Sequence, residues 1–215
     1  MKVKSLLLLL ILVISLVGCR LWGVRGSGHL KTEVRDVEDF SEVEIGGEFV
    51  VEIVIGESRN LEITAEDNLL KYIETRVSGD KLIIDTKKNL APRKQMKIKI
   101  SNPNLEGIES SGANDIYASG INENQFRVDL SGAGTVEVKG EAERVYLSVS
   151  GAGSLDCRNL LSKHTKVELS GAASADVYAS ESLDAEVSGV GSIDFYGDPE
   201  DVRSNVSGVG SISRK

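Results

Sequence analysis

The chain has 215 residues, enough for one or two domains with a sizeable core, and with 4 Phe, 1 Trp and 5 Tyr that core must consist mainly of aliphatic side chains. A formal net charge of -8 lacks the basic excess of nucleic-acid-binding proteins and makes anionic lipid headgroups poor partners for the chain as a whole. Two Cys exclude a disulfide scaffold and two His leave little material for a metal site, so we expect no cofactor.

Residues 1–18 are predicted to be a lipoprotein signal peptide. Lys2 and Lys4 precede an uncharged apolar run over residues 6–17, which is too short to cross a bilayer as a helix. The run ends in Leu-Val-Gly-Cys at residues 16–19, which resembles a bacterial lipobox. We therefore expect acyl chains such as palmitate on Cys19, and two or three such chains are enough for stable membrane anchoring.

The alternative for this segment is an ordinary signal peptide with a chance cysteine. If the lipobox is used, the protein lies in the bacterial cell envelope, extracytoplasmic and lipid-anchored. Arg20 is not the aspartate that retains lipoproteins in the inner membrane, so the outer membrane is favoured in a cell with two membranes. After Cys19, residues 19–30 contain three glycines and no periodicity, which predicts a flexible tether.

One phrase is repeated six times in the second half of the chain. Each copy begins Ser-Gly, and successive serines are separated by 20, 19, 20, 18 and 19 residues. This period suits one coil of a β-solenoid and is too short for repeats built from two helices. The serines are Ser111, Ser131, Ser150, Ser170, Ser188 and Ser207.

Aliphatic residues alternate with polar ones on both sides of each serine, which is the period of a β-strand. Stacked coils place like on like, so the aliphatic positions, including Cys157, become internal ladders. The glycine after each serine is needed either for a positive φ or because the corner has no room for a Cβ. Two positions further on, most coils have Gly and one has Asn114, which tolerates the left-handed region.

The repeats predict an all-β fold, a single-stranded parallel β-helix of about 19 residues per coil, over a head domain at residues 31–215. Residues 44–53 match the phrase in degenerate form and predict an N-terminal coil. Further strand patterns lie at 61–65, 81–85 and 96–100, and Asp67 is a candidate N-cap for a short helix. This irregular segment is expected to cap the N-terminal end of the solenoid.

The recurrent Ser-Gly-x-Gly-x-Ile phrase, the strand-rich lead-in and the lipoprotein start resemble the bacterial head GIN domain family, labelled putative auto-transporter adhesin. The resemblance covers about residues 34–215. It implies a parallel β-helix at the cell envelope, and it supplies no catalytic residues to carry over.

Outward-facing residues form the candidate ligand face. Six residues after the serines, a column of carboxylates is predicted, and adjacent carboxylates about 5 Å apart repel one another. Mobile counterions on a solvated face, or Ca²⁺ bridging between coils, are the alternatives for screening them. Two tyrosines eight residues after the serines are expected to lie one above the other, where they hold a sugar ring or cover neighbouring aliphatic groups. The residues of this face are Glu137, Asp156, Asp176, Asp194, Tyr178 and Tyr196.

The leading interpretation is a lipid-anchored envelope solenoid that binds, adheres or has a structural role, without catalysis. Its expected partners are the membrane, through Cys19, and an envelope polysaccharide or protein. Exposed strand edges at the C-terminal coil also predict a homo-oligomer, with Arg214 and Lys215 as residues that limit edge pairing. The alternative is a polysaccharide lyase or hydrolase, but coils of 18 to 20 residues leave no insertions to wall a catalytic cleft.

Overall fold

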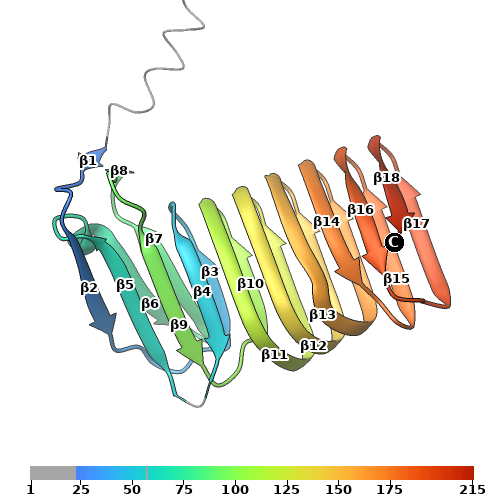
Figure 1. The fold of residues 1–215 in the computed structure, drawn as a ribbon, viewed down its shortest axis with the longest axis horizontal. Helices are drawn as coiled ribbons and strands as arrows, with labels where there is room; N and C mark the ends of the chain where they lie inside the picture. Colours follow the sequence, from blue (N-terminus) through green and yellow to red (C-terminus); the bar gives the residue numbers. More distant parts are fainter. Residues whose placement is uncertain (1–22, 57) are drawn as a thin grey trace, which may run out of the picture.

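The computed structural model describes residues 23–56 and 58–215, which form a β-solenoid with two long faces (Figure 1). Cys19 and the predicted signal peptide lie outside the described residues. Among the residues that are described, there is no helix of the length and hydropathy needed to cross a membrane.

Three long strands run across both faces of the solenoid and bend between them. They are β11 (Ala113–Leu130), β12 (Ala133–Val149) and β13 (Ala152–Leu169). Shorter strands continue each face toward the C-terminus. On the first face these are β14 (Ala172–Tyr178), β16 (Val190–Tyr196) and β18 (Val209–Arg214), and on the second face β15 (Ser182–Val187) and β17 (Asp201–Val206).

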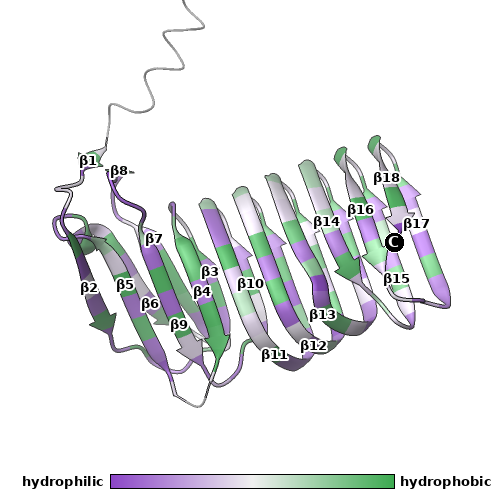
Figure 2. Cartoon of the chain, in the orientation of Figure 1, coloured by the Kyte–Doolittle hydropathy of each residue, from purple (hydrophilic) through white to green (hydrophobic). Residues whose placement is uncertain are grey.

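All of these strands pair in parallel and in the register that the repeat predicts. Val136 of β12, for example, lies between Ile116 of β11 and Leu155 of β13. Hydrophobic and polar residues alternate along the strands (Figure 2). The inward positions are almost completely buried, and each buried Val, Leu or Ile contributes about 1.5 to 3 kcal/mol. The predicted β-solenoid is confirmed.

The coils differ in length because two of them contain an extra residue. In β11 the register shifts between Ser119 and Ile121, so that Gly120, at φ 85°, has no partner in β12. In β13 the shift places both Cys157 and Arg158 opposite Val138. Each irregularity is a bulge that absorbs one residue without disturbing the corners on either side.

The Ser-Gly corners form a single row in which the backbones of successive coils touch. A Cβ on Gly151 would lie 1.9 Å from the carbonyl oxygen of Gly132, and the other five corner glycines meet the preceding coil at 1.8 to 2.1 Å. The same carbonyl accepts a hydrogen bond from the N–H of Ala152 at 3.0 Å. None of the six repeat glycines has a positive φ. Glycine is therefore required here by the close approach of two backbones.

Asn114 does not adopt the left-handed conformation, which no residue other than glycine adopts within 23–56 and 58–215. Its side chain is buried inside the first corner. The amide oxygen accepts the N–H of Phe49 at 2.9 Å, and Nδ2 donates to the carbonyl oxygen of Ile45 and to Ser110 Oγ, each at 3.2 Å. The asparagine thus provides hydrogen bonds to the first coil, which corrects the interpretation based on its φ.

The degenerate coil predicted at residues 44–53 is confirmed. It consists of β3 (Glu42–Ile45) on the second face and β4 (Val50–Ile55) on the first. β3 pairs with β10 (Gly107–Ser110), the first strand of the repeat region, and β4 pairs with β11. Val51 lies opposite Ile116 and Ile53 opposite Ala118, so both continue the internal ladder.

The irregular N-terminal cap extends both faces with antiparallel strands. The first face gains β9 (Lys97–Asn102), β5 (Asn60–Glu66) and β2 (Leu30–Arg35). The second gains a hairpin of β7 (Lys81–Thr86) and β6 (Ile73–Ser78). β2 pairs with β5, β5 with β9 and β6 with β7, all antiparallel, so the cap ends the run of parallel coils.

The helix expected after Asp67 is a single 3-10 turn, η1 (Leu70–Tyr72), whose N-cap residue is Leu69. Asp67 does not cap it. The Asp67 carboxylate instead accepts the N–H of Asn68 at 2.7 Å and the hydroxyl of Ser27. These hydrogen bonds, led by the one from Ser27, lower the pKa of Asp67.

Residues 23–30, the described part of the predicted tether, are attached to the cap. They include β1 (Val24–Arg25), which pairs with β8 (Leu90–Ala91). Asn68 holds the same segment by accepting the N–H of Ser27 at 2.9 Å and donating to the carbonyl oxygen of Arg25 at 2.8 Å. This part of the tether is therefore ordered, contrary to the expectation from its glycines.

The close approach at the corner row generates a stability prediction. We expect Gly151→Ala to lower the free energy of unfolding by about 3 kcal/mol or more, because its Cβ would overlap a backbone oxygen that cannot move alone. Gly107→Ala is the matched control, since its Cβ would meet nothing closer than 3.5 Å, and we expect a change within about 1 kcal/mol. Denaturant unfolding measures both, and equal losses would contradict the corner geometry.

Candidate functional site

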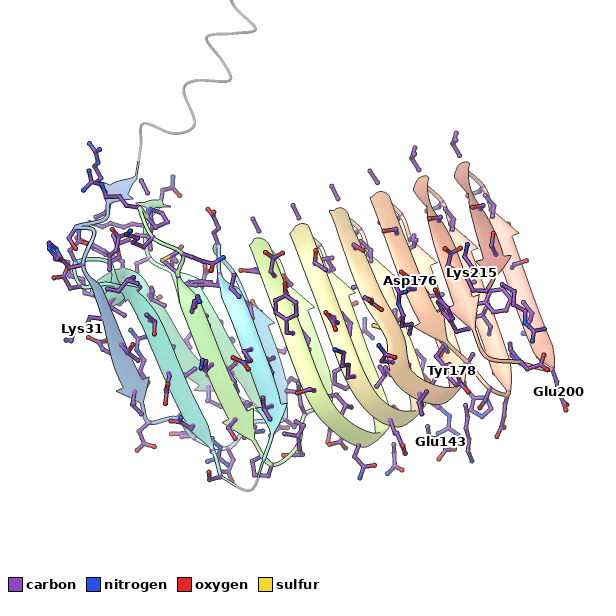
Figure 3. All side chains as sticks on the ribbon, in the orientation of Figure 1. Lys31, Glu143, Asp176, Tyr178, Glu200 and Lys215 are labelled. Carbon is purple, nitrogen blue, oxygen red and sulfur yellow. The ribbon has the colours of Figure 1, made fainter. Side chains whose placement is uncertain are left out.

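The four carboxylates predicted to form a column do lie in register across neighbouring strands. Glu137 of β12 is opposite Asp156 of β13, which is opposite Asp176 of β14, which is opposite Asp194 of β16. Figure 3 shows Asp176 on the outer surface of the first face. The four side chains are only 26 to 31% exposed, so their mutual repulsion is not fully screened by water.

Basic side chains neutralise this column directly. Arg158 lies between two coils, with Nε 2.8 Å from Asp156 Oδ1 and an Nη atom 2.7 Å from Asp176 Oδ2. Lys139 pairs with Glu137 at 2.7 Å and Lys215 with Asp194 at 3.2 Å. The hydrogen bond to Asp156 raises the pKa of Arg158, and the one to Glu137 raises the pKa of Lys139. The chain itself supplies the screening that the sequence required.

Arg158 was not identified from the sequence as part of the site. It occupies the bulge in β13, and the 20-residue interval between Ser150 and Ser170 is the only sequence signal of that bulge. Its guanidinium lies 5.5 Å from the centre of the Tyr196 ring, and the Tyr196 hydroxyl donates to Asp176 at 3.3 Å. Arginine, carboxylates and tyrosine therefore form one connected surface cluster.

The geometry offers no assembled Ca²⁺ site. Within residues 23–56 and 58–215, no group of three or more His, Cys, Asp or Glu is arranged to hold a metal ion. Carboxylate oxygens of Asp156 and Asp176 that would bridge between coils are bound to Arg158 instead.

A second acidic column, two residues before the serines, follows the same rule on the second face. Lys81 Nζ contacts Glu109 and also lies 3.4 Å from Glu42, and the bond to Glu109 raises the pKa of Lys81. Arg127 pairs with Asp129 in the next coil. Both outer faces are thus crossed by internal ion pairs.

Tyr178 and Tyr196 are neighbours, as predicted, because β14 and β16 pair them directly. Their surroundings differ. Tyr196 belongs to the Arg158 cluster, whereas Tyr178 lines a groove of about 370 Å³ at the bend between the two faces. Figure 3 places Tyr178 and Glu143 at this bend, on the edge of the solenoid away from β1 and β8.

The groove beside Tyr178 combines one apolar patch with several hydrogen-bonding groups. Leu161, which is 45% exposed, lies on its wall with Asn122, Glu141, Glu143 and Lys163. The sequence analysis did not identify these residues, since each coil places a different side chain at the bend. The carbonyl oxygen of Tyr178 accepts hydrogen bonds from Ser162 Oγ and Thr165 Oγ1, both at 2.6 Å, which fixes the backbone of the tyrosine.

Cys157 lies on the internal ladder, as predicted, and is 1% exposed. Burial raises the pKa of its thiol well above the usual range. The thiolate is the reactive form of cysteine, so this residue is chemically inert in the folded protein.

The cluster around Arg158 generates a second prediction. We expect Arg158→Met to lower the thermal midpoint, because Asp156 and Asp176 lose their shared cation, and we expect millimolar Ca²⁺ to restore part of the loss. The unchanged protein should show no Ca²⁺ effect, since Arg158 occupies the bridging oxygens. Arg144→Met is the control, because Arg144 pairs with a single carboxylate, at 3.4 Å. A Ca²⁺-dependent midpoint in the unchanged protein would contradict this account.

Comparisons with solved structures agree with the fold. A crystal structure of a putative adhesin from Bacteroides fragilis is 24% identical, with a TM-score of 0.73, and covers 90% of this chain and 100% of that one. A putative adhesin from Parabacteroides distasonis is 19% identical, with a TM-score of 0.58, over 90% and 100% of the two chains. A putative lipid binding protein from the same organism is 22% identical, with a TM-score of 0.53, over 89% and 99%. At these identities the likeness establishes the fold alone.

A search of proteins with curated functions returned no match. The family model described as putative auto-transporter adhesin, head GIN domain, matches residues 39–199, which include the cap and nearly all of the coils. The chain therefore belongs to the head GIN domain family of putative auto-transporter adhesins.

Proposed function

We propose that the protein is a lipid-anchored head of the bacterial cell envelope that binds an envelope polysaccharide and carries out no catalysis. Family membership supports an extracytoplasmic or cell-surface location and an adhesive role. The lipobox at residues 16–19 supports attachment through Cys19, and Arg20 favours the outer membrane if the cell has one.

The observation that carries the binding proposal is the groove beside Tyr178. An exposed aromatic ring and Leu161 provide apolar area for the face of a sugar, while Asn122 and Glu141 offer acceptors and a donor for its hydroxyl groups. The fixed backbone of Tyr178 reduces the ordering that a ligand would have to impose. A protein ligand is the alternative outcome of the binding test.

The arrangement of the outer carboxylates favours binding over a lyase or hydrolase. The acidic columns of both faces are paired with Lys and Arg rather than directed into a cleft. No corner insertion rises above the coils between Ser111 and Ser207, where the intervals stay at 18 to 20 residues. A polysaccharide enzyme remains the competing function, and turnover is measured in the same experiment as binding.

Self-association through the C-terminal coil is a further part of the proposal. β17 and β18 each pair on one side only among the described strands, which leaves an edge available to a second copy. Arg214 stands opposite Phe195 and Ser204 opposite Ala185, so polar groups occupy two inward places of this coil and limit how tightly a copy can pack. A light-scattering concentration series measures the association.

The anchor is tested at Cys19. We expect Cys19→Ser to abolish incorporation of labelled palmitate and to release the protein from the membrane fraction. Cys157→Ser is the matched control and should keep both the label and the membrane association, because Cys157 is buried and unreactive. Labelled palmitate on the Cys19→Ser protein would contradict lipidation at this residue.

Ligand binding is tested on the full chain with an array of neutral and acidic envelope glycans. We expect Tyr178→Ala to weaken binding at least tenfold, which corresponds to about 1.4 kcal/mol and is within the range of one aromatic contact. Tyr146→Ala is the control, because Tyr146 is 38% exposed on the second face, outside the groove. Equal effects of the two substitutions would count against the groove, and glycan cleavage lost in Asp176→Asn would establish the enzyme instead.

A further inference from the structure

The overall negative charge of the chain conceals a strongly basic segment. Between Asp85 and Glu106 the sequence contains six basic residues and no acidic one. They are Lys87, Lys88, Arg93, Lys94, Lys97 and Lys99. The acidic excess lies elsewhere, chiefly in the coils that follow. A prediction about partners based on net charge alone therefore does not describe this part of the surface.

The basic segment lies beside the point where the described chain begins. β8, in the middle of the segment, pairs with β1 through Val24 opposite Leu90 and Arg25 opposite Ala91. Figure 1 shows β1 and β8 together at the N-terminal end of the solenoid. Gly23, the first described residue, is four positions after Cys19, so the segment adjoins the proposed anchor.

A buried carboxylate holds the two parts together. Glu66, at the end of β5, is completely buried. Its Oε1 accepts the N–H of Gly28 at 2.6 Å, and its Oε2 accepts those of Arg93 at 2.8 Å and Lys94 at 3.4 Å. A Cβ on Gly26 would lie 2.0 Å from Oε2, so the chain must pass the carboxylate as glycine. The position of the basic residues relative to residues 23–28 is therefore fixed.

Five exposed side chains make up the surface that we call the basic loop: Arg25, Lys87, Lys88, Arg93 and Lys94. Lys87 pairs with Glu74 at 2.6 Å, and Lys88 lies 4.9 Å from the centre of the Tyr72 ring. For the other three, no carboxylate of residues 23–56 or 58–215 lies within 4.0 Å. Their charges are available to an external partner.

We propose that the basic loop docks against anionic lipid headgroups of the membrane that carries the anchor. This inference rests on the proposed lipidation of Cys19, which would bring the loop to the bilayer. Each basic residue close to an anionic surface increases partitioning about fivefold. Salt screens charges beyond about 8 Å at physiological ionic strength, whereas the nearest carboxylate column begins three strand spacings, about 14 Å, from β9. Local charge therefore outweighs net charge.

Docking through the basic loop would also orient the ligand groove. Arg93 and Lys94 share a depression with Glu48 and Ala113, which belong to the corner edge of the first coils, so the loop adjoins that edge. The Tyr178 groove lies at the bend on the opposite edge (Figures 1 and 3). A head held by the loop would thus present the groove away from the bilayer. Glu48 and Asp115 in the same depression limit the positive surface to the loop itself.

The test uses the full chain, purified from membranes and reconstituted in phosphatidylcholine vesicles with or without phosphatidylglycerol. An environment-sensitive dye is attached at Asn89→Cys, in the basic loop, or at Glu200→Cys, at the far end of the solenoid (Figure 3). Cys157 is buried and does not compete for the dye. Quenching by a lipid with a headgroup spin label reports how closely each dye approaches the bilayer.

We expect the dye at residue 89 to be quenched at least fivefold more than the dye at residue 200, in anionic vesicles only. High salt should abolish the difference, and so should the combined variant Lys87→Gln, Lys88→Gln, Arg93→Gln and Lys94→Gln. A charge-matched variant, Arg144→Gln, Lys163→Gln, Lys166→Gln and Arg203→Gln, should retain it. Equal quenching in neutral vesicles, or quenching that survives in the basic-loop variant, would overturn the proposal.

Flotation separates this inference from the anchor on which it rests. A chain that floats with both kinds of vesicle, but shows no charge-dependent quenching, keeps its anchor and loses the docking surface. A chain that floats with anionic vesicles alone, and only with the basic loop intact, lacks the anchor and keeps the surface. If soluble alginate shifts the dye at residue 89 while anionic vesicles do not, an anionic polymer replaces the membrane as partner.

Discussion

The architecture depends on the contact between successive corners, where the carbonyl oxygen of one glycine lies where the next glycine would carry its Cβ. Side chains are excluded from this row, so the backbones meet directly and each carbonyl accepts an N–H from the coil above. That contact sets the register. Once it is fixed, aliphatic residues at equivalent positions must stack, which yields a continuous core from chemically modest side chains.

The same register has an electrostatic cost, because it places carboxylates over carboxylates on both outer faces. The chain offsets this cost with cations from its own strands. Lys139 and Lys166 act within a strand, two residues from their partners, whereas Arg158 acts between coils. The bulge in β13 is what makes the second arrangement accessible, because the additional residue displaces Arg158 from the regular alternation toward two carboxylates at once.

Features that recur in every coil could be predicted from the sequence. The corner serines, the internal ladders, the carboxylate columns and the degenerate coil at 44–53 all follow from the repeat, because identical neighbours leave few alternative registers. Features that occur once could not. Asn114, Glu66 and Asp67 act through contacts with residues 38 to 69 positions away, and no local pattern announces such partners.

Regions without periodicity were also the least predictable, for the same reason. Glycines at 23, 26 and 28 suggested flexibility, yet Gly26 is there because it passes the buried Glu66 carboxylate, and its neighbours are held by backbone pairing. Likewise the groove at the bend is formed by side chains that change from coil to coil. Ligand recognition in this fold is therefore written in the irregular positions, while the regular ones specify the scaffold that displays them.

The glycine row has a consequence for how such proteins vary in length. Every junction between coils has the same backbone contact, so duplication or loss of one whole repeat recreates a junction already present elsewhere in the molecule. A gene encoding this domain can therefore change the reach of the protein in steps of about 4.8 Å without redesigning any interior. The structure behaves as a ruler whose graduations evolution can add or remove one at a time.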